Sequence, residues 1–257
     1  MNKYNSLNFK IPVESDDYCE ASSFVIKSIE AILANAIKTG NNRIVINTNL
    51  RNGLPMENIN KIAGPIVEAW AGELFESISQ DNGNEWDLVH SETCSRLGMA
   101  DIILQFKKTT TLGSYLIANV DSKATAEDLD KSGKSPNITS FARIRSAYIE
   151  DADFIFVILS LKHKVFCQKN DKTGLTDSIM EVVKYNAYDI KYISEPDISY
   201  NPALGTGQLQ IKDIHYVNLT KRTTWEFCQM LDKKYLSSSK RTFNDWLALA
   251  NQNGWIK

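Results

Sequence analysis

The chain has 257 residues, of which 43% are hydrophobic and 23% charged, and its formal net charge is −2. This is the composition of an ordinary globular protein with a substantial core, and it lacks the strong positive charge of a general nucleic-acid coat protein. No apolar run has transmembrane length and the polar N-terminus lacks a signal peptide's apolar segment, so no membrane association is expected. The four cysteines form no Cys-x-x-Cys pair, which disfavours a zinc site or a disulfide framework and indicates the cytoplasm.

The first half of the chain mixes helical and extended patterns. Helices are predicted over 15–38, where apolar residues form a broad stripe, and over 57–79, where Gly64-Pro65 suggests a kink or a fresh start. Short apolar segments predict strands over 43–47, 86–90, 98–106 and 114–123. The polar stretch 107–113 between the last two strands is typical of a hairpin connection.

The second half is predicted to continue in the same way. A polar loop over 124–137 precedes a helix that ends at Glu150, with Asn137 or Thr139 as its cap. The most apolar run, 153–161, has the length and β-branched content of a buried central strand. The remaining segments predict a helix over 176–185, a strand over 208–217, and helices over 222–235 and 242–251. Without repeats, low-complexity segments or linkers, residues 1–257 are expected to form one α/β domain.

The two strands around Asp101 and Asp121 carry the strongest chemical pattern. Alternate side chains of a strand share a face, so Asp121 and Lys123 point the same way, and pairing of the two strands can bring Asp101 close to them. Two carboxylates and a lysine at one strand edge are the groups that a Mg²⁺-dependent phosphodiester hydrolase needs. Asp-x-Lys also occurs by chance, and the alternative is a solvated hairpin whose charges face water.

Three further segments have weaker patterns. Glu68 lies on a predicted helix and can reach a metal site, although a solvent-facing helical glutamate is the more ordinary interpretation. The segment Lys131–Ser135 resembles the tail of a phosphate-binding loop, but Asp128 replaces the required glycine and Pro136 follows. The amide-rich segment 199–210 could read base edges or could be an ordinary turn, and basic residues outnumber acidic ones from Asn201 onward.

Taken together and in order, these segments resemble a type II restriction endonuclease of the PD-(D/E)xK superfamily. The likeness is to the blunt-cutting EcoRV and HincII group, and closest to HpaI-type enzymes. It spans roughly residues 60–235. Five segments carry it: Gly64-Pro-Ile-Val-Glu68; Ala100-Asp101-Ile-Ile-Leu; Val120-Asp121-Ser-Lys123; Ser135-Pro-Asn-Ile138 with Ser140; and Tyr200-Asn201 with Gln208-Leu-Gln210. The chain departs from the pattern in having Ala100 where proline is expected, and its hairpin between the two aspartates is longer.

The resemblance implies an α/β restriction-endonuclease-like core with a mixed central β-sheet flanked by helices. It implies catalysis by Asp101, Asp121 and Lys123, with the two aspartates as Mg²⁺ ligands and Glu68 as a possible accessory. It also implies DNA contacts from a set of basic, amide and hydroxyl side chains: Lys134, Asn137, Asn201, Thr206, Gln208 and Gln210.

The implied activity is hydrolysis of double-stranded DNA at a short palindromic site, with GTTAAC cut to blunt ends and 5′-phosphates as the expectation. A palindrome cut on both strands implies a homodimer, and a restriction-modification system implies a cognate methyltransferase as genetic partner. Two alternatives stay open: a repair or structure-specific nuclease of the same superfamily, and a non-catalytic DNA-binding protein on the same fold.

Overall fold

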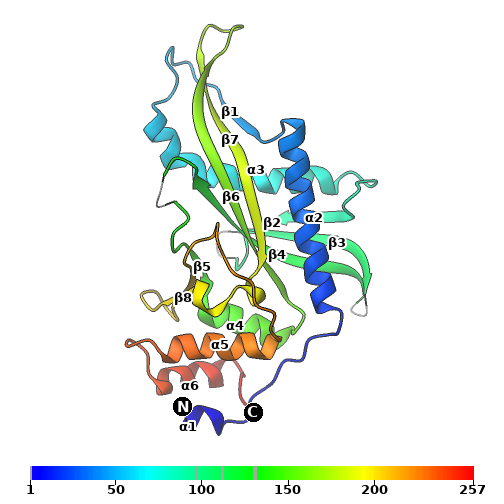
Figure 1. Ribbon diagram of the computed structural model, residues 1–257, viewed down its shortest axis with the longest axis vertical. Coiled ribbons are helices and arrows are strands. Elements are labelled where there is room, and N and C mark those ends of the chain that lie inside the picture. Colours follow the sequence, from blue (N-terminus) through cyan, green and yellow to red (C-terminus); the bar gives the residue numbers. More distant parts are fainter. Residues whose placement is uncertain (1, 96–97, 111–112, 130–131) are drawn as a thin grey trace.

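A six-stranded mixed sheet forms the centre of the computed structural model, which describes residues 2–95, 98–110, 113–129 and 132–257. Its strand order is β1-β7-β6-β4-β3-β2, in which β4 and β6 are parallel and every other neighbouring pair is antiparallel. The long hairpin of β6 and β7 reaches the top of Figure 1. The strand bounds are β1 Arg43–Ile46, β2 Leu88–Thr93, β3 Ile102–Thr110, β4 Gly113–Ala126, β6 Ile155–Lys169 and β7 Thr176–Asp189.

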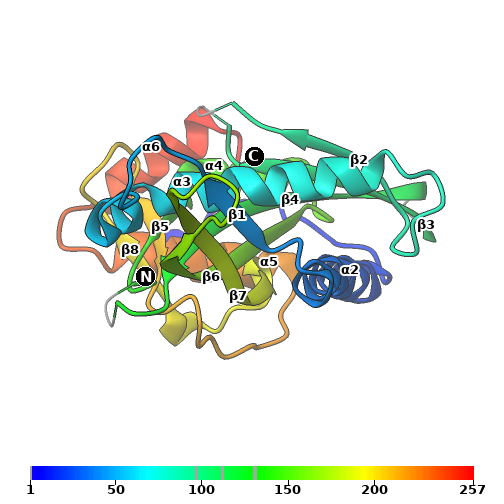
Figure 2. The ribbon, with the colours of Figure 1, turned by 90° about the horizontal axis from the view of Figure 1, so that it is seen from above.

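Helices cover both faces of this sheet, as its alternating side chains require. On β6, Val157 and Leu159 pack into one apolar cluster with α2 and α3, whereas Phe156 and Ile158 pack into a second cluster on the opposite face. Seen from above, α3 runs across the sheet and α2 is viewed end-on beside it (Figure 2). The predicted α/β class and the mixed sheet flanked by helices are therefore confirmed. The helices are α1 Asn2–Asn5, α2 Tyr18–Thr39, α3 Met56–Ser79, α4 Phe141–Glu150, α5 Thr224–Leu236 and α6 Phe243–Gln252.

A second, three-stranded sheet packs on the lower side of the molecule (Figure 1). Its strand order is β5-β9-β8, with both pairs antiparallel, and it contributes Ile198, Leu209 and Ile211 to the second apolar cluster. The strands are β5 Asn137–Ser140, β8 Ile198–Asn201 and β9 Gln208–Ile211, and two short 3-10 turns, η1 Ile190–Tyr192 and η2 Glu195–Asp197, lead into β8 from β7.

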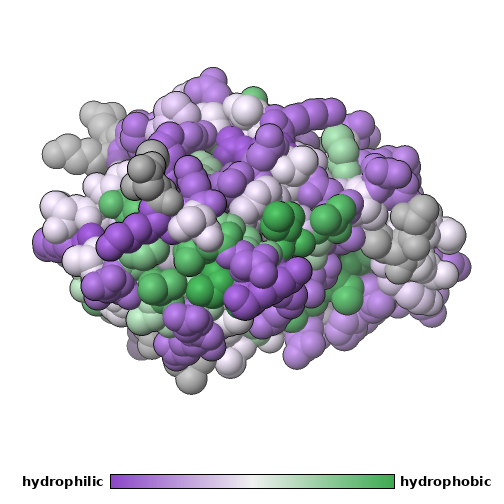
Figure 3. Space-filling model, turned by 90° about the horizontal axis from the view of Figure 1, so that it is seen from below, coloured by the Kyte–Doolittle hydropathy of each residue, from purple (hydrophilic) through white to green (hydrophobic). Residues whose placement is uncertain are grey.

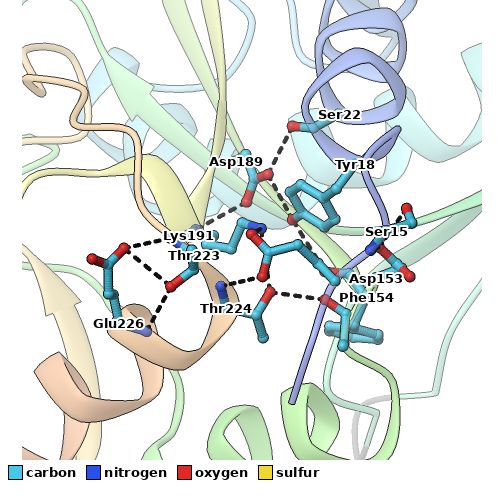
Figure 4. Close-up of polar contacts among 12 residues, drawn as sticks. Ser15, Tyr18, Ser22, Asp153, Phe154, Asp189, Lys191, Thr223, Thr224 and Glu226 are labelled. Atoms are coloured by element: carbon cyan, nitrogen blue, oxygen red, sulfur yellow. Dashed lines mark hydrogen bonds and ion pairs between the residues drawn. The ribbon is translucent and has the colours of Figure 1, made fainter. Parts of the chain in front are cut away.

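A buried polar network ties α2 to the end of β7 (Figure 4). Tyr18 and Ser22 of α2 donate hydrogen bonds to Asp189 Oδ2, at 2.8 and 2.7 Å. The fully buried Lys191 ammonium lies 3.3 Å from Glu14 Oε1 and 3.2 Å from Thr224 Oγ1 at the start of α5. Each buried charge thus has polar partners, and the network joins three segments that are far apart in sequence.

The lower end of the molecule carries the helices α1, α5 and α6, and Figure 3 shows apolar side chains gathered on that face. A hollow of about 740 Å³ there is lined by Tyr4, Leu236 and Phe243 together with polar side chains such as Lys3 and Lys233. None of the predicted catalytic residues lines it. Within the part of the chain described here, no helix is long and apolar enough to cross a membrane.

The structure corrects one element outright: residues 176–185, predicted as a helix, belong to the strand β7. β7 pairs with β6 from Thr176 to Asp189, and a short turn joins the two strands, with Gly174 at φ 70°. The β-branched residues Ile179, Val182 and Val183 suit such a pairing, and backbone pairing on both edges outweighs helix propensity. The glycine-containing turn between two apolar runs was the overlooked hairpin signal.

Several predicted boundaries also change. Neither Asn137 nor Thr139 caps α4, because the helix begins at Phe141 and Ser140 therefore occupies the cap position. The strand predicted over 208–217 ends at Ile211, because the chain turns where the Asp213 carboxylate accepts the backbone N–H of His215. α3 runs unbroken through Pro65. Parts of the predicted polar connections 107–113 and 124–137 belong to the strands β3 and β4. Lys131 of the segment that resembles a phosphate-binding loop lies outside the described residues.

Candidate active site

The predicted catalytic residues meet where β4 extends beyond its neighbour β3. The last paired residues are Ile102 and Val120, and β4 then continues to Ala126 with β6 on one side. Asp101 stands immediately before β3, whereas Asp121 and Lys123 are the next residues of β4 on one face. The long hairpin therefore does not keep the aspartates apart, since it pairs in register along most of its length.

Lys123 is the centre of this group. Its ammonium lies 2.8 Å from Asp121 Oδ2 and 3.9 Å from Asp101 Oδ2. The Asp121 side chain is only 5% exposed, whereas that of Asp101 is 48% exposed. Among the described residues, Asp121 Oδ2 has no further polar partner besides this ammonium. One buried and one open carboxylate thus flank a single cation.

The edge of β4 that β3 leaves open is completed by side chains. The backbone N–H of Ser122 donates to Asp101 Oδ2 at 2.8 Å, and that of Ala124 donates to Glu68 Oε1 at 3.3 Å. The next outward N–H, of Ala126, donates to Ser132 Oγ at 2.9 Å. Carboxylates thus take the place of a neighbouring strand, which satisfies the strand edge and holds both acids beside Lys123.

The electrostatics of the group follow from its burial. Burial raises the pKa of Asp121 to about 7, with contributions from the Asp101 and Glu68 carboxylates, although the neighbouring Lys123 opposes the rise. Burial also raises the pKa of Glu68. For Lys123, burial acts to lower the pKa, but the surrounding carboxylates outweigh it and the net shift is upward. The charged form of Lys123 is therefore favoured at this position.

The site has the donors of a hard divalent cation, but few of them. Among the described residues no cluster of three His, Cys, Asp or Glu side chains could hold a metal ion. Mg²⁺ does not require such a cage, because it is commonly held by one or two carboxylates together with substrate phosphates and water. The buried carboxylate of Asp121, whose Oδ2 contacts only the Lys123 ammonium among the described residues, and the open carboxylate of Asp101 fit that mode.

The residues predicted to contact DNA collect on and around the small sheet. Asn137 of β5 pairs with Gln210 of β9, and Gln208 of β9 pairs with Asn201 of β8. Gln210 Nε2 donates to Asn137 Oδ1 at 3.0 Å, and Thr206 shares a hydrogen bond with Ser140. The side chains of Gln210 and Thr206 are therefore each held by a neighbour on β5 at partly exposed positions. Lys134 forms an ion pair with Asp213, so its ammonium already has an acidic partner.

Two side chains near these groups were missed from the sequence. Arg241, in the turn before α6, donates to Tyr200 Oη at 2.9 Å and to the carbonyls of Pro202 and Gly205. His215 lies between Thr125 of β4 and Ser160 of β6. No local pattern marks either residue, since their partners are about 40 or more residues away.

Comparison with known proteins identifies the family of the chain. Residues 5–254 match the family model described as type II restriction endonuclease HpaI. The chain is also 56% identical over 255 residues to the type II restriction enzyme HpaI of Haemophilus parainfluenzae, and the match covers 99% of each chain. The chain therefore belongs to the HpaI family of type II restriction endonucleases, which are site-specific deoxyribonucleases that act on double-stranded DNA.

Proposed function

We propose that this enzyme hydrolyses phosphodiester bonds of a short palindromic DNA site in a Mg²⁺-dependent reaction, leaving 5′-phosphate and 3′-hydroxyl ends. The observation that carries the proposal is the group of Lys123, buried Asp121 and half-open Asp101 at the open edge of β4. The family membership supplies the class of reaction, and the group supplies the residues that would perform it.

Each residue of the group has a distinct role in this proposal. Asp121 and Asp101 would hold Mg²⁺, and the bound ion would polarise the scissile phosphate and stabilise the charge that develops there. The Lys123 ammonium would orient the attacking water in line with the leaving oxygen. Glu68 would act as an accessory by accepting the Ala124 N–H and thereby fixing the strand that carries Lys123.

The proposed target is GTTAAC, cut to blunt ends. Support for it comes from the 56% identity to HpaI over nearly the whole chain. Amide side chains can pair bidentately with adenine edges in the major groove, and Asn137, Asn201, Gln208 and Gln210 provide them on one small sheet. Thr206 fixes the loop before β9, and Lys134 would exchange its contact with Asp213 for a phosphate.

The biological setting belongs to the same proposal. A palindrome cut on both strands favours a twofold homodimer of chains that each form one domain over 1–257. A cognate methyltransferase would protect the host DNA. The four cysteines are free, which suits a reducing cytoplasm.

The test is a digest of long unmethylated duplex DNA with purified protein, in parallel with Mg²⁺ and with chelator. We expect discrete fragments only with Mg²⁺, and sequencing of their ends should give blunt GTT/AAC termini with 5′-phosphates. Different discrete ends would correct the target alone. A smear would contradict the single short site, and equal cutting in chelator would contradict the Mg²⁺ requirement.

A further inference from the structure

His215 occupies a position between the catalytic strand and the DNA-binding sheet. Thr125 lies two residues after Lys123 on the same face of β4, and Ser160 of β6 is the direct parallel partner of Lys123. The His215 ring bridges both hydroxyls, with Nε2 2.8 Å from Thr125 Oγ1 and Nδ1 3.0 Å from Ser160 Oγ. Its two contacts therefore border Lys123 on its own strand and on the neighbouring strand.

Both contacts of the ring are hydrogen bonds to hydroxyl groups, which can donate or accept. Thr125 Oγ1 also lies 3.4 Å from the carbonyl of Leu161. When Thr125 donates to that carbonyl, it accepts from His215 Nε2–H, and Ser160 Oγ donates to the unprotonated Nδ1. One imidazole thus links side chains of both strands next to the lysine.

The backbone around His215 belongs to the DNA-binding side. Asp213 accepts the His215 N–H and at the same time pairs with Lys134. The N–H of Ile214 donates to the carbonyl of Gly133 at 3.1 Å. Gly133 lies so close to the ring that a side chain would not fit there, because a Cβ at this position would lie 2.8 Å from His215 Nε2. A displacement of the segment 132–135 would therefore reach the imidazole directly.

We propose that His215 is a positioning residue that couples DNA contacts of the 132–135 and 208–213 segments to the placement of Lys123. This rests on the proposed function, in which Lys134 and Gln210 contact the duplex and Lys123 orients the water. Through the His215 bridge, the position of Lys123 depends on which DNA sequence the small sheet has bound. His215 therefore contributes to discrimination between cognate and altered DNA sites as well as to the cleavage rate.

The experiment is single-turnover cleavage at varied enzyme concentration, on a cognate duplex and on a duplex with one altered base pair. His215→Ala should cleave the cognate duplex roughly tenfold more slowly at saturation, because two hydrogen bonds that align the strands are lost. Its half-saturating concentration should change less than about threefold, because no proposed DNA contact is removed. The ratio of cognate to altered-site rates should fall.

Further variants separate this coupling from a structural role. Thr125→Val should give the same slow cleavage, and the double variant His215→Ala/Thr125→Val should be no slower than either single one, because both remove one bridge. His215→Gln, whose amide can still donate to Thr125, should recover part of the rate. His90→Ala, which removes an exposed imidazole on β2, is the matched control.

The outcomes are distinct. Wild-type rates in His215→Ala, or slow cleavage that merely follows a lost folded fraction in thermal unfolding, would overturn the coupling and leave the proposed function standing. Additive effects of His215→Ala and Thr125→Val would also overturn it. Failure of the wild-type enzyme to cut with Mg²⁺ would overturn the proposed function itself and this inference with it.

Discussion

Lys123 lies among three carboxylates that differ in burial, and this difference assigns them different roles. Buried Asp121 has the raised pKa and the close contact to the ammonium, whereas Asp101 is open to solvent and Glu68 holds the strand edge. The Lys123 ammonium is thereby held from several sides, while the Asp101 carboxylate stays accessible to solvent. Such an arrangement suits a residue that must keep its position when a polyanionic substrate arrives.

Removal of the Lys123 ammonium should therefore reduce DNA cleavage much more than it reduces DNA binding. For Lys123→Ala we expect cleavage to fall by roughly 10³-fold or more, while specific DNA binding survives, because the proposed base contacts lie on the other sheet. Asp121→Ala should abolish cleavage as well. Plasmid cleavage and gel-shift assays measure the two effects, with Lys164→Ala of β6, whose side chain is 45% exposed beside Glu181, as control. Full cutting by Lys123→Ala would contradict the assignment.

His163 predicts a pH dependence of stability that is independent of the active site. Its imidazole is buried on β6, neither ring nitrogen has a polar partner among the described residues, and burial lowers its pKa. Below the unfolded-state pKa of about 6.5 the unfolded chain binds more protons than the folded one, so stability is lost as the pH falls. His163→Leu should show a smaller drop in Tm than wild type between about pH 7.5 and pH 5.5. Thermal unfolding at both values tests this, and an equal drop in both proteins would refute it.

At the level of elements, the loop between β8 and β9 is held by contacts from its own ends and from the turn before α6. Tyr200 Oη donates to the carbonyl of Thr206 at 2.8 Å and accepts from Arg241, which also reaches two carbonyls of the loop. Gly207 has φ 91°, and a Cβ there would lie 2.2 Å from the Tyr200 ring. The loop that follows Asn201 and carries Thr206 is thus held in one conformation rather than free to adapt.

Arg241 should consequently matter for recognition. Arg241→Ala should weaken binding of the cognate duplex by roughly tenfold, since the loop regains conformational freedom and its carbonyls lose a charged donor. Arg241→Lys should recover little, because a single ammonium cannot replace the guanidinium fork. Titration of a labelled duplex gives both affinities. If lysine restores full affinity, charge rather than loop geometry is responsible.

The sequence predicted most elements because their patterns are local. The buried strand around 153–161 and the helices near 15–38 and 222–235 are confirmed, since their apolar content and periodicity arise within one segment. The grouping of Asp101, Asp121 and Lys123 could be predicted because Asp-x-Lys lies on one strand and Asp101 immediately before its neighbour. β7 and the roles of His215 and Arg241 could not, because pairing and contacts over long sequence separations determine them.

On the scale of the whole molecule, the central sheet separates two apolar cores. One cluster anchors α2 and α3, the helix that carries Glu68. The second cluster holds the small sheet, α4, α5 and α6. β4 and β6 lie between them, so the proposed catalytic edge is supported by one core and the proposed DNA-reading surface by the other. In the proposed function, a single chain would thereby present one catalytic group and one recognition surface, which would suffice for one strand and one half of a palindrome.

Two chains would then be required to cut both strands. Dimers that combine one wild-type chain with one inactive chain test this requirement. We expect a dimer in which one chain is wild type and the other carries Lys123→Ala to bind the intact palindrome but to cut only one strand, because each active site would serve one strand. Co-expression with two affinity tags would yield the mixed species. Supercoiled plasmid should then be converted to the open circle and not to the linear form, whereas wild-type dimers should give linear DNA. Linear product from the mixed dimer, at a rate like that of wild type, would mean that one active site cuts both strands.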